Sequence, residues 1–181
     1  MKKEIYQKIE IPENIGAEIE GNILKINGPE GEVKKRFDIG RLEFKKEGNE
    51  IIIGNKKSTK REKKLINTIR SHIQNMIKGV QKKFEYHLKI CFNHFPITVD
   101  IKDKEVLVKN FLGERVPRKT RILEGVEVEI NKDIIKVRSA DKELAGQVAA
   151  NFETITKIRN RDRRVFQDGI FIINKEGRDM Q

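Results

Sequence analysis

The chain contains two copies of one pattern, and this duplication restricts its possible folds more than any other feature of the 181 residues. Residues 19–32 can be laid over residues 101–114 without a gap. Leu24 then meets Val106, Ile26 meets Val108, and the Gly-Glu pairs at 31–32 and 113–114 coincide. Internal similarity of this kind indicates a repeated structural unit. We therefore predict two tandem homologous domains.

The first copy has the pattern of short strands followed by one helix. Alternating apolar and polar residues, punctuated by glycine and proline, predict strands. These strands cover residues 5–11, 17–20, 23–27, 32–38, 42–46 and 51–54. Thr59 and Glu62 have the spacing of a capping box, which starts a helix. Apolar residues from Leu65 to Val80 recur at steps of three and four, so they form one helical face, and Gly79 is the predicted end.

The second copy repeats this plan. Its predicted strands are residues 88–92, 97–101, 106–109, 115–121, 126–130 and 134–138, and residues 169–173 return as a closing strand. Ser139 or Asp141 can cap a helix with an apolar stripe between Leu144 and Ile155. Runs of strands followed by a helix predict the α+β class, with an antiparallel sheet packed against one main helix in each domain. We place the domains at residues 1–83 and 84–181.

A dense cluster of positive charge directly precedes the predicted closing strand. It consists of Lys157, Arg159, Arg161, Arg163 and Arg164. Asp162 is the only acid among them. Guanidinium groups stay charged at physiological pH, and their planar donor forks fit phosphate oxygens. A solvated face is about as common an explanation for an isolated charge run.

The composition favours a polyanionic partner. The chain has 39 Lys and Arg against 28 Asp and Glu, a net charge of +11 and a pI near 9.7, as expected of a nucleic-acid-binding domain. Binding to an anionic membrane would require bulky apolar anchors or a lipidation motif. The chain has no Trp and no N-terminal Gly or C-terminal Cys motif. RNA or DNA is therefore the favoured partner.

Cysteine content and apolar runs predict a cytoplasmic protein. The single cysteine, Cys91, cannot form an internal disulfide. Residues 1–13 lack the apolar core of a signal peptide. No apolar run is long enough to span a bilayer.

Candidate catalytic features are incomplete. Residues 54–59 resemble a phosphate-binding loop, but Lys56 stands where that loop needs glycine, so a basic helix start is the simpler interpretation. Cys91 and His94 have the spacing of half a zinc site, without a second pair of ligands. His72 has no evident acid or nucleophile partner. We predict no enzyme activity, no metal, no cofactor and no small-molecule substrate.

Aromatic residues provide no evident platform for stacking bases. They make up 6% of the chain, and no aromatic submotif of an RNA recognition module is present. Phe37, Phe44 and Phe152 occupy positions typical of a core. Binding through phosphates and the shape of a folded RNA is therefore favoured over the reading of splayed bases.

Several motifs resemble one family in both order and spacing. They are residues 93–97, 110–114, 117–119, 125–128, 149–151 and especially 161–170. Together they closely resemble the archaeal and eukaryotic branch of the universal large-subunit ribosomal protein called L-six, over essentially the whole chain. The bacterial branch usually has a Lys/Gly-rich loop where this chain has Val165 to Gly169. Loop contacts of bacterial members are therefore not transferred.

The resemblance implies a structural protein that binds large-subunit rRNA near the sarcin–ricin loop and the stalk base, in the cytoplasm. Neighbouring ribosomal proteins and nearby translation GTPase factors would be its partners. The implied RNA contacts come mainly from the second domain and its C-terminal segment. They are Lys157, Arg159, Arg161, Arg163, Arg164, Gly169, Lys175 and Arg178, with Arg115, Arg118, Lys119 and Arg121 as a second set. The first domain's lysines are either a solvated face or a weaker contact.

Two other classes stay open from the residues alone. A free-standing RNA-binding regulator or RNA chaperone would share the same basic surface. An RNA-modifying enzyme would need an acid–base or metal constellation.

Overall fold

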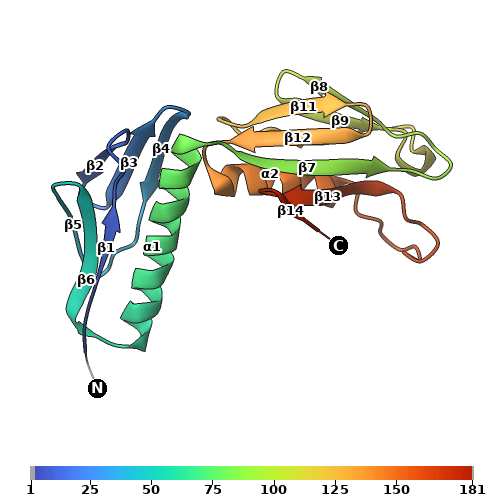
Figure 1. Ribbon diagram of the computed structural model, residues 1–181. Coiled ribbons are helices and arrows are strands. Elements are labelled where there is room, and N and C mark those ends of the chain that lie inside the picture. The colour runs from blue at the N-terminus through green and yellow to red at the C-terminus, as the bar shows by residue number, and fades with distance from the viewer. Residues whose placement is uncertain (1–2, 181) are drawn as a thin grey trace. The chain divides into compact units, whose positions relative to one another are not determined.

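The computed structural model describes residues 3–180 (Figure 1). The chain divides into two compact units between Lys83 and Phe84, called unit 1 and unit 2 below. The predicted α+β class, with tandem units that each contain one main helix, is confirmed. The structure adds that the strands of each unit form two antiparallel sheets.

Unit 1 consists of six strands and the long helix α1. Its elements are β1 (Lys3–Glu10), β2 (Gly16–Glu20), β3 (Ile23–Gly28), β4 (Gly31–Arg36), β5 (Glu43–Glu47), β6 (Glu50–Ser58) and α1 (Lys60–Gln81). One sheet has the order β1-β6-β5 and the other β2-β3-β4. Helix α1 packs against β1 and β6 of the first sheet and β3 and β4 of the second (Figure 1). The core of unit 1 therefore lies between the helix and both sheets.

Helix α1 begins where the capping box predicts. The Thr59 amide donates to Glu62 Oε2 at 2.8 Å, and the Arg61 amide donates to Thr59 Oγ1 at 3.3 Å. The buried face runs from Ile66 to Val80. Leu65, which the periodicity assigned to that face, is only partly buried. The helix ends at Gln81, two residues beyond the predicted end.

Strand β6 continues four residues beyond the predicted end at Gly54 and takes up most of the segment that resembles a phosphate loop. Gly54 pairs with Tyr6 on one side and Glu43 on the other. A Cβ atom at Gly54 would lie 2.3 Å from the Tyr6 ring. Close strand packing therefore explains this glycine.

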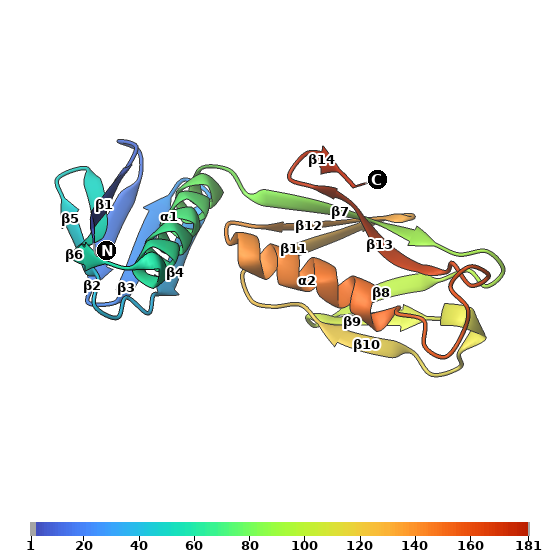
Figure 2. The same cartoon turned by 90° about the horizontal axis from the view of Figure 1, so that it is seen from below.

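Unit 2 consists of eight strands, a short 3₁₀ turn and helix α2. Its elements are β7 (Phe84–Cys91), β8 (Thr98–Lys102), β9 (Glu105–Lys109), η1 (Phe111–Gly113), β10 (Arg118–Arg121), β11 (Glu127–Asn131), β12 (Ile134–Ser139), α2 (Lys142–Ile155), β13 (Gly169–Lys175) and β14 (Arg178–Asp179). The sheets have the orders β10-β9-β8 and β11-β12-β7-β13-β14. Helix α2 packs on β7, β12 and β13 of the larger sheet and on β10 of the smaller (Figure 2).

Three details of unit 2 differ from the sequence prediction. Strand β7 begins at Phe84, four residues before its predicted start. Strand β10 begins at Arg118, because residues 111–113 form a 3₁₀ turn and the chain enters the strand only after Pro117. Strand β14 was not predicted, and it pairs with the end of β13. Of the two candidate caps of α2, Asp141 accepts the Glu143 amide at 2.8 Å.

The duplication holds in three dimensions for the hairpins. Ala17 pairs with Ile26 in unit 1, and Val99 pairs with Val108 in unit 2, as the alignment of the two copies requires. The correspondence stops after that hairpin. The glycines of the two aligned Gly-Glu pairs lie in different elements. Gly31 begins β4, whereas Gly113 is the last residue of the 3₁₀ turn. Strands β13 and β14 extend the sheet that contains β7, and the described residues of unit 1 form no corresponding strands.

Candidate nucleic-acid interface

The predicted basic cluster lies on the loop that joins α2 to β13, residues 157–168 (Figure 2). Its five cationic side chains, Lys157, Arg159, Arg161, Arg163 and Arg164, are all exposed. Within residues 3–180, none of the five forms an ion pair. The loop therefore presents concentrated positive charge in side chains that form no ion pair with the described carboxylates.

Hydrogen bonds from helix α2 hold the strand that follows this loop. Thr156, only 3% exposed, accepts the Ile170 amide at 2.9 Å and donates to the Phe152 carbonyl at 3.2 Å. Glu153 Oε1 accepts the Ile172 amide at 3.0 Å. A side chain of α2 and that of its C-cap residue, Thr156, thus satisfy backbone donors of β13 that a neighbouring strand would otherwise take.

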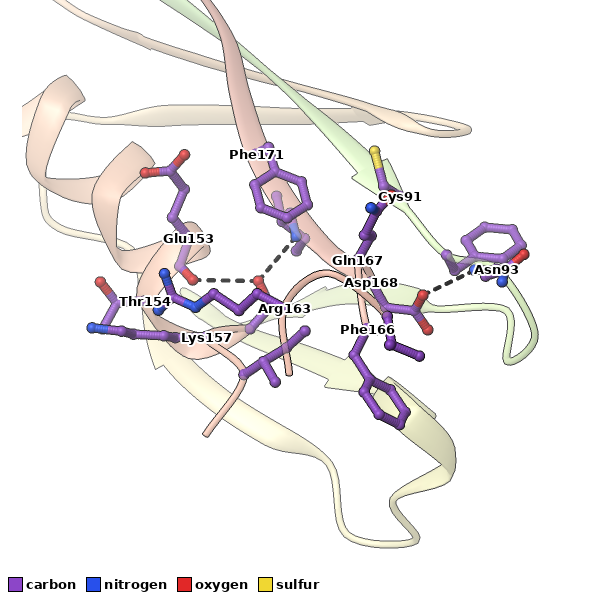
Figure 3. A pocket seen from close by; sticks show the side chains of 15 residues that line it. Cys91, Asn93, Glu153, Thr154, Lys157, Arg163, Phe166, Gln167, Asp168 and Phe171 are labelled. Carbon is purple, nitrogen blue, oxygen red and sulfur yellow. Dashed lines mark hydrogen bonds between the residues drawn. The ribbon is translucent and has the colours of Figure 1, made fainter. Parts of the chain in front are cut away.

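The loop itself contains further fixed points. Asp168, 6% exposed, accepts the Asn93 amide at 3.1 Å and ties the loop to the end of β7 (Figure 3). Asp162 accepts the Arg164 amide at 2.9 Å, and the Phe166 amide donates to the Asp162 carbonyl at 3.0 Å. The Arg161 guanidinium lies 4.9 Å from the centre of the Phe166 ring. The one acid of the cluster therefore shapes the turn.

A groove of about 950 Å³ opens between this loop, the end of α2 and the start of β13 (Figure 3). Lys157 and Arg163 line it together with the acids Glu153 and Asp168. Its apolar wall includes three phenylalanines, Phe92, Phe166 and Phe171. Phe92 is 43% and Phe171 is 45% exposed. These rings were not predicted as part of a site, although Phe171 follows the buried Ile170 along a strand and so points to the opposite face.

Gly169, which was predicted as an RNA contact, lies inside unit 2. It is buried and pairs with Cys91 at the start of β13. A Cβ atom there would lie 3.1 Å from the Phe171 ring, closer than ordinary contact. Close packing within unit 2 therefore restricts this position to a residue without a side chain.

The two arginines nearest to this loop in the second predicted set behave differently from each other. Arg115 is exposed. Arg118 makes two bonds to the Glu114 carboxylate, at 2.8 and 2.5 Å, and donates to the Ile155 carbonyl at 2.7 Å. Its guanidinium carbon also lies 4.3 Å from the centre of the Phe111 ring. Arg118 is therefore engaged inside unit 2, where it holds β10 against the end of α2.

The pKa of the Glu114 carboxyl depends on neighbours from two segments, Arg118 of β10 and Arg161 of the basic loop. The hydrogen bonds from Arg118 hold the pKa of its carboxyl below the usual value. The positive charges of Arg118 and Arg161 lower that pKa further. The structure thus brings the start of β10 and the basic loop together.

Lys119 and Arg121 lie farther along β10, away from the loop. They line a separate hollow of about 690 Å³, which also includes Lys102 and Lys104. Arg121 lies 3.8 Å from Glu105, in a contact with little shielding from solvent. These two cations therefore belong to a different part of the surface.

Lys175 ends β13, and Arg178 begins β14. They pair with each other in the β13–β14 ladder. Six residues of extended chain separate Lys175 from Gly169, which corresponds to roughly 20 Å. The structure therefore does not add them to the cluster at the loop.

The two histidines of unit 2 each contact another side chain of the same unit. His87 Nε2 lies 2.6 Å from Glu85 Oε1. This hydrogen bond, supported by Arg138, lowers the pKa of Glu85. The His94 ring packs edge-on against Phe95. Over residues 3–180, no three His, Cys, Asp or Glu side chains gather as metal ligands, and no helix there could cross a bilayer.

Comparisons with known proteins cover both units. The family model described as Ribosomal protein L6 matches residues 11–83 and 95–169. The large ribosomal subunit protein uL6 of Staphylothermus marinus is 46% identical over 172 residues, which is 93% of each chain. The uL6 protein of Methanothrix thermoacetophila is 39% identical over 175 residues, or 97% of this chain and 99% of that protein. That of Sulfurisphaera tokodaii is 43% identical over 173 residues, or 95% and 93%.

Proposed function

Because the chain belongs to the ribosomal protein L6 family, we propose that it is a structural, non-enzymatic part of the large ribosomal subunit that binds rRNA chiefly through unit 2. The main support for this binding surface is the set of five exposed cations without ion pairs on the loop 157–168. Arg115 extends this surface, and Arg118 positions it from within.

Phosphate neutralisation is the mechanism that these side chains support. Guanidinium forks donate two hydrogen bonds to a phosphate, and each contact releases condensed counterions from the RNA. The bonds at Thr156, Asp162 and Asp168 fix the loop before binding, so less conformational entropy is lost on association. A preorganised loop of this kind suits the shape of a folded RNA better than a free tail does.

The family resemblance supports a finer placement. We assign the contact to rRNA near the sarcin–ricin loop and the base of the stalk, beside other ribosomal proteins of the cytoplasmic large subunit. There the protein would buttress the region where translation GTPase factors dock. RNA that extends beyond the basic loop would be needed for any contact with the remaining predicted cations, Lys119, Arg121, Lys175 and Arg178.

The test is sucrose-gradient fractionation of cell extract in moderate and high salt, with detection of the protein in each fraction. The wild type is expected to comigrate with large subunits in stoichiometric amount. Changing Arg161, Arg163 and Arg164 to Ala should release it at lower salt. A persistent free pool without subunit association would contradict the proposal and favour a free-standing RNA-binding regulator or chaperone.

A further inference from the structure

Most of the net positive charge lies in unit 1, which does not contain the basic loop. Unit 1 has 20 Lys and Arg against 12 Asp and Glu, a net charge of +8. Unit 2 has 19 against 16, a net charge of +3. The function proposed above uses unit 2 and leaves the larger excess unexplained.

The excess is concentrated where β6 leads into α1. We call the six cations there the junction cluster: Lys56, Lys57, Lys60, Arg61, Lys63 and Lys64. All six are exposed. Among the described residues, none of them forms an ion pair. The one acid within the cluster, Glu62, is used by the capping box with Thr59.

The second copy of the fold shows that this junction does not require cations. Strand β12 leads into α2 in the same way, and Asp141 stands at the capping position that Thr59 has in unit 1. The residues that follow are Lys142, Glu143, Leu144 and Ala145. Lys142 is paired with Glu176 at 2.6 Å, and Ala145 is buried. One copy thus builds the junction with balanced charge, so the fold does not explain the six cations of the other.

The position of the junction cluster is unfavourable for the isolated protein. The amino end of a helix carries the positive end of the helix dipole, which disfavours cations. Lys60 and Lys64 also stand four residues apart, where like charges repel. A bound polyanion reverses both effects, because its phosphates are attracted by the dipole and by the side chains.

The surroundings of the cluster favour RNA over an acidic protein. The nine exposed large apolar side chains of the described residues all lie between Phe92 and Met180, in unit 2. Protein interfaces need an apolar centre and are poor in lysine. Five of the six cations are lysines, which act as point charges toward phosphates. We infer that the junction cluster is a second RNA-binding surface, which contacts phosphates of helical rRNA without reading sequence.

The test measures the affinity of the full chain for a short RNA duplex of arbitrary sequence as a function of salt. The test variant changes Lys56, Lys57, Lys60 and Lys63 to Gln. The matched control changes Lys34, Lys45, Lys78 and Lys82 to Gln, four exposed lysines of unit 1 that form no ion pair in the described chain. Both variants lower the net charge equally, so they separate a local surface from general charge.

Four lost phosphate contacts should reduce the slope of log affinity against log salt by about 3 to 4. The control should change that slope far less. The same difference is expected when Arg161, Arg163 and Arg164 are also Ala, which separates this inference from the function of unit 2. Equal losses from the two lysine variants would overturn the inference and leave the proposed function standing.

A second measurement identifies the partner in assembled subunits. An iron chelate is attached to a cysteine at Thr68, an exposed position of α1, in a chain with Cys91 changed to Ser. Hydroxyl radicals from this position should cut rRNA, whereas a chelate at Glu18 on β2 should cut it weakly. The inference would be overturned if incorporated protein cuts no rRNA from position 68. It would also be overturned if the radicals from that position cut only an acidic protein.

Discussion

Unit 1 and unit 2 share the plan of strands packed against one main helix, but their two clusters of cations lie at opposite ends of the helices. In unit 1 the junction cluster lies at the start of α1, and in unit 2 the basic loop follows the end of α2. The cations of unit 1 stand on a strand and a helix. Those of unit 2 stand on a loop that depends on buried hydrogen bonds at Thr156 and Asp168.

This difference shows how a duplicated fold can acquire two kinds of surface. Regular structure presents cations without further support, because its backbone hydrogen bonds are already made. A loop needs specific side chains that fix its course, and unit 2 supplies them from α2 and from the loop itself. Unit 2 also exposes aromatic rings beside its cations, whereas the junction cluster is a surface of charge alone.

The largest expected effect tests whether the two units are independent. Changing the fully buried Phe152 to Ala should destabilise unit 2 by about 3–5 kcal/mol, because it leaves a cavity under α2. Hydrogen exchange of the full chain should then show lower protection in residues 84–180 and unchanged protection in residues 3–83. Changing the buried Ile73 of α1 to Ala is the converse variant. Equal losses in both units would mean that they unfold together.

The next effect tests whether the loop of unit 2 must be held in place. Changing Thr156 to Val keeps the side-chain shape but leaves the Ile170 amide without its acceptor, at a cost of about 1–3 kcal/mol. RNA affinity should fall although no charge is removed. Changing the exposed neighbour Thr154 to Val is the control. If the Thr156 variant binds RNA like the wild type, charge alone is sufficient and the contrast with unit 1 is wrong.

Much of the fold could be predicted because its signals are local. The capping box needs only Thr59 and Glu62, and alternation along the chain marks each strand. Ribosomal L6 membership was also predicted, from motifs of the second copy between residues 93 and 170 whose order and spacing match the family. Among the candidate site residues, the basic loop could be proposed from the sequence because its cations fall within eight consecutive residues, 157–164.

The remaining features depend on contacts between distant residues. Arg115 and Arg118 look alike in sequence, but only Arg118 reaches the Ile155 carbonyl, 37 positions away. The aligned Gly31 and Gly113 have different settings because a 3₁₀ turn precedes β10. Lys175 lies near the loop in sequence and far from it along an extended strand. Local patterns cannot supply such relations.

A smaller effect tests whether the junction cluster serves the fold or a ligand. Changing Lys56, Lys57, Lys60 and Lys63 to Gln should stabilise the RNA-free protein by about 1 kcal/mol at low salt, since it removes repulsion and an unfavourable dipole interaction. Urea unfolding at low and high salt would measure this gain, which salt should reduce. The control with Lys34, Lys45, Lys78 and Lys82 changed should show no such gain. Destabilisation by the first variant would assign the cluster a structural role.

The smallest effect concerns the ion pair between Glu114, which follows the 3₁₀ turn, and Arg118 at the start of β10. Glu114 is 39% and Arg118 is 28% exposed, so solvent limits the pair to about 0.5–1 kcal/mol. The lowered pKa of Glu114 means that this stability is present above about pH 4.3, the pKa of a free glutamate, and is lost as the pH falls through the folded value.

Changing Glu114 to Gln should therefore destabilise unit 2 at neutral pH, and the difference from the wild type should shrink in acid. Urea unfolding at a series of pH values measures it. Changing Glu105 to Gln, which breaks only a 3.8 Å contact with Arg121, is the control. A difference that persists unchanged in acid would show that Glu114 acts through packing. Arg118 would then hold β10 through its bond to the Ile155 carbonyl and its contact with Phe111 alone.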